Sequence, residues 1–179
     1  MKTAKKFVVL FFLFLYYDTA LFAVSEESIK LAYLERFTMF IQWPRPIDTY
    51  NVCIHNDDDF AKTLQKTYSS RLFNNRPVKV TSLHSGDSPN EMLKCHILYF
   101  RGSKPSQNET LLSALRKNSV LIISDDDDDT RQGAMIGFYL ENNMFRFVIN
   151  QRNLENANLN ASYKLLNFAT VIDPTGGTK

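Results

Sequence analysis

Cys53 and Cys95, the two cysteines of the chain, each have a histidine close to them in the sequence. His55 lies two residues after the first thiol, and His96 directly follows the second. Thiols and imidazoles can bind zinc, but neighbouring residues on a strand point to opposite faces, and the chain has no Cys-x-x-Cys pair. In an oxidising compartment a disulfide between Cys53 and Cys95 is favoured, with zinc as the weaker alternative.

Five consecutive aspartates, Asp125 to Asp129, form the densest run of charge in the chain. A calcium loop of the helix–loop–helix type needs carboxylates at alternate positions, a glycine at its sixth position and a glutamate at its twelfth. The run has none of this spacing. We therefore interpret it as a solvated loop after a strand and expect no metal site there. Weak binding of a divalent cation, from charge density alone, stays an alternative.

Motifs of the common catalytic sites are missing from the sequence. There is no Gly-x-Ser-x-Gly elbow, no His-Glu-x-x-His, no phosphate-binding glycine loop and no dinucleotide fingerprint. His55 ends an expected strand, where α/β proteins place ligands, but a lone histidine there is more often a turn residue. Gly102-Ser103 could hold an anion at a helix start, but Lys104-Pro105 fits a plain loop at least as well. We expect no catalytic residue and no cofactor.

Helical and strand patterns alternate through the first two thirds of the chain. Apolar residues at helical spacing are found at residues 26–43, 57–68 and 109–116. Short apolar or alternating runs, typical of strands, are found at residues 51–55, 78–83, 97–100 and 120–123. This order predicts a parallel sheet with helices packed on it. The strand at 120–123 should lie near the centre because it is apolar throughout.

The last third of the chain has a different pattern. Residues 134–141 and 144–150 indicate two strands joined by Asn142-Asn143, a pair that tolerates positive φ, and this predicts an antiparallel hairpin at the edge of the sheet. Residues 151–158 and 162–171 are predicted to form two helices. The expected fold class is α/β: a single three-layer domain with a mixed, mostly parallel sheet, a C-terminal antiparallel hairpin and flanking helices.

Residues 1–23 have the pattern of an export signal. Three lysines precede an apolar run at residues 7–17, and a small-residue exit ends at Ala23. The run is too short to cross a bilayer as a helix, so an uncleaved anchor is the weaker alternative. We therefore expect a signal peptide at 1–23, a periplasmic α/β domain at 24–173 and a flexible tail at 174–179.

The net charge of the chain depends on this leader. The full chain has 21 basic and 19 acidic residues, and the leader holds three of the basic residues and one of the acidic ones. The remainder has 18 of each sign and is neutral. A neutral domain has no electrostatic reason to bind nucleic acid, and we expect no nucleic-acid partner.

Aromatic residues cluster in and after the first expected helix, and most of them should belong to the core. Trp43 is the candidate exception, because it precedes Pro44 at the end of that helix and tryptophan is enriched at binding surfaces. Trp43 and its neighbour Phe40 are therefore the predicted partner-binding residues.

Five segments of the chain carry a family pattern. They are residues 30–44 (KLAYLERFTMFIQWP), 94–100 (KCHILYF), 133–138 (GAMIGF), 145–150 (FRFVIN) and 159–166 (LNASYKLL). Together they resemble the YfiR family of periplasmic regulators of diguanylate cyclases. Members of that family usually have Gly-Gly-Met-Ile-x-Phe, Phe-Glu-Ile-Asn and a double serine before Lys-Leu-Leu. Here Ala134, Val148 and Tyr163 depart from those patterns.

The resemblance implies a periplasmic protein without catalytic activity. Such a protein binds and represses the periplasmic domain of an inner-membrane diguanylate cyclase or similar receptor, and an outer-membrane lipoprotein relieves the repression. We also expect that the protein can form a homodimer. Cys53 and Cys95 match the family's cysteine pair by position, whereas a second pair has no counterpart here. The alternative function is a periplasmic small-ligand binding protein that feeds a membrane receptor. A hydrolase is disfavoured because nucleophile–base pairs are missing.

Overall fold

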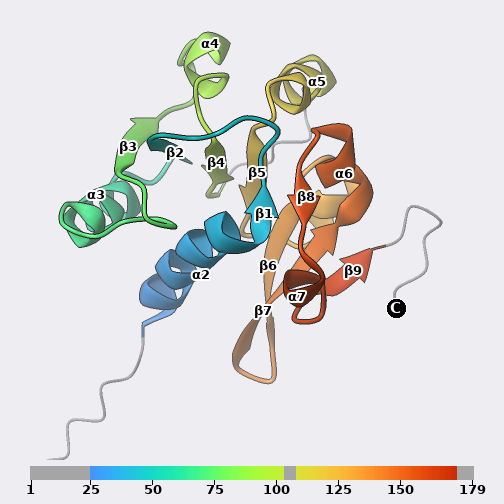
Figure 1. The fold of residues 1–179 in the computed structure, drawn as a ribbon. Coiled ribbons are helices and arrows are strands. Elements are labelled where there is room, and N and C mark those ends of the chain that lie inside the picture. The colour runs from blue at the N-terminus through green and yellow to red at the C-terminus, as the bar shows by residue number, and fades with distance from the viewer. Residues whose placement is uncertain (1–24, 103–107, 173–179) are drawn as a thin grey trace, which may run out of the picture.

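The computed structural model describes residues 25–102 and 108–172, and a seven-stranded sheet runs through this part of the chain (Figure 1). The strands are β1 (Ile41–Gln42), β2 (Tyr50–His55), β3 (Val78–Leu83), β4 (Ile97–Phe100), β5 (Leu121–Ser124), β6 (Ile136–Glu141), β7 (Met144–Asn150), β8 (Asn160–Ala161) and β9 (Thr170–Ile172). The helices are α2 (Glu26–Phe40), α3 (Asp58–Tyr68), α4 (Pro89–Met92), α5 (Glu109–Lys117), α6 (Gln151–Asn156) and α7 (Tyr163–Leu166), with a 3₁₀ turn η3 (Asp128–Arg131). The predicted signal peptide and tail lie outside the described residues.

The order of strands in the main sheet is β3-β2-β4-β5-β6-β7-β9. The first five are parallel, β7 runs antiparallel to β6, and β9 is parallel to β7. The crossover from β2 through α3 to β3 and the crossover from β4 through α5 to β5 run in opposite directions across the sheet. Because such crossovers are right-handed, α3 and α5 lie on opposite faces of the sheet. α2 lies beside α3, since the Tyr68 hydroxyl donates to Glu35 at 2.6 Å, and α6 contacts α5. The predicted α/β fold is confirmed.

The central strands β4 and β5 are buried at every position, because helices cover both faces of the sheet. The expectation that residues 120–123 form a core strand is confirmed, with Ile122 fully buried. Phe37 of α2 packs on β6 and β7. Its ring centroid lies 6.1 Å from that of Phe138 and 5.4 Å from that of Phe147. Among the described residues, no helix is both long enough and apolar enough to cross a membrane.

The first helix begins as predicted but ends earlier. Ser25 caps it by accepting a hydrogen bond from Ser28 N at 3.2 Å. The helix stops at Phe40 and not at residue 43, because the next two residues form β1, which pairs antiparallel with β8. Trp43 precedes Pro44, and the residue before a proline avoids the helical conformation. The backbone leading to Pro44 is therefore expected to be extended. The β1–β8 pair links the first helix to the C-terminal part of the fold.

The prediction of a helix over residues 162–171 is wrong. Only Tyr163–Leu166 makes a single helical turn, and Thr170–Ile172 forms strand β9. β9 pairs with the side of β7 that faces away from β6, so β9 is the edge strand. The prediction that the hairpin of β6 and β7 forms the edge of the sheet is therefore wrong. Three β-branched residues in a row, Thr170, Val171 and Ile172, suit a strand, and an unpaired neighbouring strand supplies the partner.

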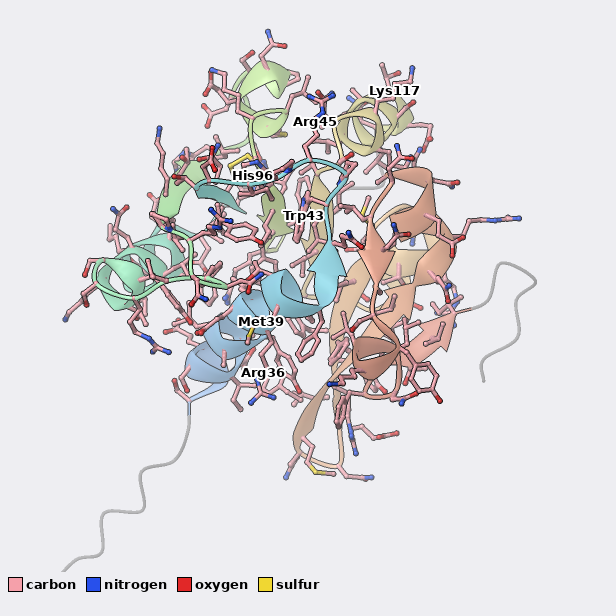
Figure 2. All side chains as sticks on the ribbon, viewed as in Figure 1. Arg36, Met39, Trp43, Arg45, His96 and Lys117 are labelled. Atoms are coloured by element: carbon pink, nitrogen blue, oxygen red, sulfur yellow. A yellow bond between two sulfur atoms is a disulfide. The ribbon has the colours of Figure 1, made fainter. Side chains whose placement is uncertain are left out.

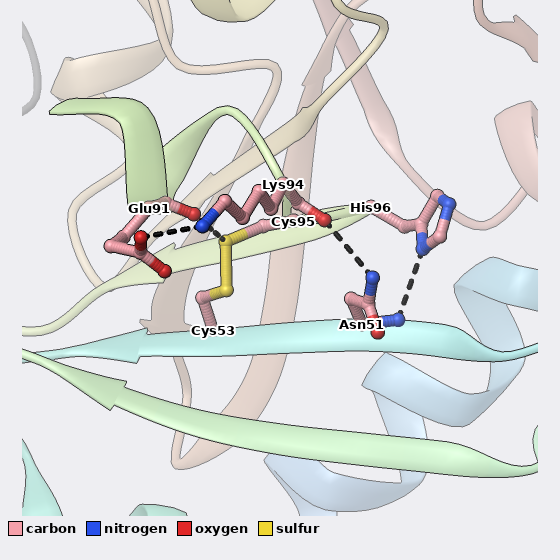
Figure 3. Close-up of a disulfide and its surroundings, with 6 residues drawn as sticks. All are labelled: Asn51, Cys53, Glu91, Lys94, Cys95 and His96. Atoms are coloured by element: carbon pink, nitrogen blue, oxygen red, sulfur yellow. Dashed lines mark hydrogen bonds and ion pairs between the residues drawn. A yellow bond between two sulfur atoms is a disulfide. The ribbon is translucent and has the colours of Figure 1, made fainter.

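Cys53 on β2 and Cys95, two residues before β4, form a disulfide with a Cα–Cα distance of 5.9 Å (Figure 3). The predicted bridge is therefore present, and the zinc alternative is wrong because both sulfur atoms are used in the bond. β2 and β4 are adjacent strands, so the bond ties the middle of the sheet. The sequence separation is 42 residues, for which the chain-entropy model assigns about 4 kcal/mol.

Candidate functional site

The carboxyl ends of three parallel strands bring charged residues together at one edge of the sheet. Asp57 follows β2, Arg101 follows β4 and Asp125 follows β5. The Nε atom of Arg101 lies 2.9 Å from Asp57 Oδ2 and 3.5 Å from Asp125 Oδ2. The guanidinium lies over the Phe60 ring, 4.4 Å from its centroid. We call the following five residues the carboxyl-edge cluster: Lys30, Asp57, Tyr99, Arg101 and Asp125.

Lys30 of α2 completes this cluster although it is 95 residues from Asp125 in the sequence. The residue is only 3% exposed, and its Nζ lies 2.7 Å from Asp125 Oδ1 and 2.7 Å from Glu26 Oε1. Tyr99 donates its hydroxyl to the same Asp125 oxygen. Burial, together with the Asp125 carboxylate, raises the pKa of the Tyr99 hydroxyl, so it stays protonated and keeps donating. The cluster holds two cations and two carboxylates that neutralise one another within the fold.

The aspartate run is therefore only in part the solvated loop that the sequence predicted. Asp125 belongs to the carboxyl-edge cluster, and Asp129 is 1% exposed and accepts a hydrogen bond from the Ser124 hydroxyl. Only Asp126 and Asp128 are exposed. Residues 25–102 and 108–172 contain no group of three or more His, Cys, Asp or Glu side chains that could hold a metal ion. Asp125 and Asp129 therefore join the run to the fold, and the exposed aspartates face solvent.

The opposite edge of the sheet is hollowed on both sides of Trp43. The loop from β1 to β2 crosses this edge, and Figure 2 shows Trp43 and Arg45 on it, with Lys117 on α5 nearby. A groove of about 460 Å³, called here the Phe40 groove, has among its lining residues Met39, Phe40, Trp43, Tyr50, Arg76 and Ala161. A pocket of about 350 Å³, called here the His96 pocket, has among its lining residues Trp43, Arg45, His96, Lys117, Ser119 and Asn158.

The two predicted partner-binding residues lie together on the Phe40 groove. Both are half-buried and pack against the core. Trp43 makes an edge-to-face contact with Tyr50 at 5.6 Å between ring centroids. The buried indole Nε1 of Trp43, which can only donate, has no hydrogen-bond partner among the described residues. The Phe40 carbonyl accepts a hydrogen bond from Ser162 N at 2.8 Å, which joins the groove to the start of α7.

His96 is held in one tautomer by the strand next to it (Figure 3). Its Nδ1 accepts a hydrogen bond from Asn51 N at 3.0 Å, and Asn51 Nδ2 donates to Lys94 O at 3.1 Å. Burial lowers the pKa of His96, so the ring is neutral at pH 7. Since Nδ1 is the acceptor, the ring proton lies on Nε2, which is turned away from Asn51.

The other two histidines are not brought together with His96. His55 lies at the carboxyl end of β2, buried, with its ring centroid 5.0 Å from that of Phe100, and burial lowers its pKa. His84 is exposed, with Nε2 3.0 Å from Asp58 Oδ1. His55 pairs in register with Phe100, the last residue of β4, whereas His96 precedes that strand. His55 was predicted to be a turn residue rather than a ligand-binding one, and the structure instead buries it at the end of β2.

Sequence reasoning missed two exposed large side chains beside the Phe40 groove. Met39 is in the groove lining and Tyr163 follows the lining residue Ser162; they are 55% and 77% exposed, and they form what we call the α2–α7 surface. α7 contacts α2, and Figure 2 shows Met39 on the same face as Trp43. One signal was present in the sequence, because Tyr163 stands where the resembled family has a serine. Helical spacing could not distinguish Met39 from the buried residues around it.

Residues 27–170 match the sequence model of the YfiR/HmsC-like family. The chain belongs to the YfiR/HmsC-like family. The match begins in α2 and ends at β9, so it includes both edges of the sheet. A comparison with curated proteins found no match. The family is periplasmic, regulatory and non-catalytic, and the resemblance seen in the sequence is confirmed.

Two signature segments of this YfiR/HmsC-like chain position the aspartate run. A Cβ atom on Gly137 of β6 would lie 2.6 Å from Asp127 Cα, so only glycine allows the strand to approach the run this closely. Asn150, at the end of β7, donates from Nδ2 to Thr130 O at 2.8 Å and accepts from Asn153 N at 3.0 Å. These segments therefore hold η3 and α6 against the sheet.

Proposed function

We propose that this protein is a non-enzymatic periplasmic regulator that binds and represses the periplasmic domain of an inner-membrane signalling protein, a diguanylate cyclase. The observation that carries the proposal is the YfiR/HmsC-like match over residues 27–170. The absence of common catalytic motifs from the sequence agrees with it. An outer-membrane lipoprotein that relieves the repression, and a homodimer, belong to the same proposal.

The proposed docking site is the Phe40 groove together with the α2–α7 surface. Half-buried Trp43 and Phe40 lie beside exposed apolar side chains, which supports a hydrophobic centre for an interface. Arg36 and Arg45 are exposed on the same face and would form part of a polar rim (Figure 2). Aromatic residues and arginine are the types that most often dominate binding energy at interfaces.

Deletion of the gene tests the repressor function. Because a repressor lowers the activity of its cyclase, loss of the protein should raise cellular cyclic-di-GMP and surface attachment. Deletion of the partner cyclase in the same strain should abolish the increase, and the wild-type gene supplied in trans should reverse it. Unchanged cyclic-di-GMP, under conditions in which the protein is expressed, would contradict the proposal.

Two exposed large hydrophobic residues test the docking site. Tyr163→Glu places a charge on the α2–α7 surface and should weaken binding to the purified periplasmic domain of the cyclase by roughly tenfold or more, the effect of losing a central contact. Leu140→Glu makes the same change on the β6–β7 hairpin, where Leu140 is 62% exposed, and should leave the affinity within about twofold. Equal effects of the two substitutions would exclude this surface.

A further inference from the structure

The His96 pocket is lined by hydrogen-bond donors from three separate parts of the chain. Arg45 comes from the β1–β2 loop, His96 from the residue before β4, and Lys117 from the end of α5. Amide and hydroxyl groups are added by Asn118, Ser119 and Asn158, and no aspartate or glutamate belongs to the lining. The pocket's volume of about 350 Å³ is within the range of small-molecule sites.

The two cations of the pocket are not neutralised within the fold. Arg45 and Lys117 are both exposed, and neither forms an ion pair with any residue in 25–102 or 108–172. Lys117 has a structural role as well, since a cation in the last turn of a helix interacts favourably with the macrodipole. That role does not account for Arg45, which lies in a loop.

The ends of α5 and α6 oppose this positive charge only in part. Each helix C-terminus carries a partial negative charge of about half a unit, and both helices end near the pocket. The last carbonyls of α5 are capped, since Asn118 N donates to Ala114 O at 3.2 Å and Val120 N donates to Leu115 O at 3.1 Å. Two full cations therefore outweigh the helix ends.

His96 adds a donor whose direction is set by its neighbour. Its Nδ1 is occupied by the Asn51 N–H, so Nε2 carries the proton and is the ring atom left to donate. The apolar side of the pocket is formed by Trp43, Pro44, Pro46 and Ile47. Convergent cations and neutral donors beside an apolar wall are the features of a site for an anionic group on a small organic molecule.

We propose that the His96 pocket binds a small molecule through an oxyanionic group, a carboxylate or a phosphate. Arg45 and Lys117 supply charge-assisted hydrogen bonds, and His96 Nε2–H supplies a neutral one. The inference rests on the geometry of the pocket alone and holds whether or not the protein represses a cyclase.

Calorimetric titration of the exported protein with two probes tests the site. Sodium phosphate and sodium acetate are titrated at pH 7.5 against sodium chloride of equal ionic strength, so that general screening is subtracted. Saturable binding of at least one probe is expected, and the stronger probe identifies the preferred oxyanion. If neither probe binds saturably, or if a cation such as magnesium binds in the pocket instead, the inference is overturned.

Charge-removing variants connect the binding to the pocket. Arg45→Gln and Lys117→Gln should each weaken the probe by roughly tenfold or more, since each removes a hydrogen bond from a charged group. Lys79→Gln, at an exposed lysine on β3, is the matched control and should leave the affinity unchanged. All three residues are exposed, so the variants should melt like the wild type. Equal effects of the three variants would mean adventitious anion binding and would also overturn the inference.

Discussion

The two edges of the parallel sheet carry similar residue types in opposite states. At the carboxyl edge, Lys30 and Arg101 are enclosed and lie against Asp125 and Asp57. At the amino edge, Arg45 and Lys117 are exposed and line the His96 pocket, which contains no carboxylate. The two cations at the first edge are paired inside the fold, and the two at the second have no acidic partner among the described residues.

The two edges also differ in what they could bind. Parallel α/β sheets usually bind ligands at the carboxyl ends of their strands, where the loops converge. Here those loops contribute an internal ion cluster that joins α2 to the sheet, and hollows of about 460 and 350 Å³ flank Trp43 at the other edge. We therefore expect substitutions at the carboxyl edge to change stability and substitutions at the amino edge to change binding.

The largest expected effect is at Lys30. Lys30→Met removes the buried cation from Asp125 and Glu26 and should lower the free energy of unfolding by about 3 kcal/mol, the low end for a buried pair, because Asp125 is only partly buried and keeps Tyr99 and Arg101. The comparison residue at the amino edge is Lys117, whose change to Met should cost less than about 0.5 kcal/mol because the side chain is exposed. Urea denaturation measures both, and similar costs would remove the distinction between the edges.

The disulfide should have an effect of similar size. Cys53→Ser opens the bridge between β2 and β4 and should lower the free energy of unfolding by about 2–4 kcal/mol. Adding Cys95→Ser should then change stability by less than about 1 kcal/mol, because the bond is already lost. Alkylation of the native exported protein without reductant, followed by intact-mass measurement, should modify no thiol. Two alkylated cysteines would contradict the bridge.

Substitutions of Trp43 test whether its indole N–H, at the amino edge, lacks a hydrogen-bond partner. Trp43→Phe keeps an aromatic ring against Tyr50 and removes an indole N–H that lacks a partner, so stability should change by less than about 1 kcal/mol. Trp43→Ala removes the ring as well and should cost more, about 2 kcal/mol for a half-buried aromatic side chain. Thermal melting of both variants measures this. A cost above about 2 kcal/mol for Trp43→Phe would show that the N–H is paired.

The smallest expected effect is the pH dependence from His55 and His96, one at each edge. Burial lowers both pKa values from 6.5, so below that pH the unfolded chain takes up protons that the folded protein does not. Stability from these groups is complete above pH 6.5 and is lost as pH falls from 6.5 towards the lowered values. Melting temperatures from pH 7.5 to 5.5 should therefore decrease. His55→Gln and His96→Gln should each reduce the slope, and an unchanged slope in one variant would assign the effect to the other edge.

Local patterns were sufficient for most of the elements of the fold. The apolar runs at β4 and β5, the capped start of α2 at Ser25 and the Asn142-Asn143 turn are each recognisable within a few residues. The cysteine pair was also predicted correctly, since an oxidising compartment and two cysteines leave few alternatives. The segment at 162–171 failed because pairing with β7 overrides a weak helical pattern.

The sequence by itself determined the disulfide, the family and the order of helices and strands apart from β1, β8 and β9, because each depends on spacing and residue type within short segments. The tertiary structure alone decided what the charged residues do. Asp125 is neutralised by Lys30, 95 residues away, while Arg45 and Lys117 line a pocket that has no acidic residue in its lining. Whether a charge is paired or available depends on which distant segments pack beside it, and residue spacing along the chain carries no record of that.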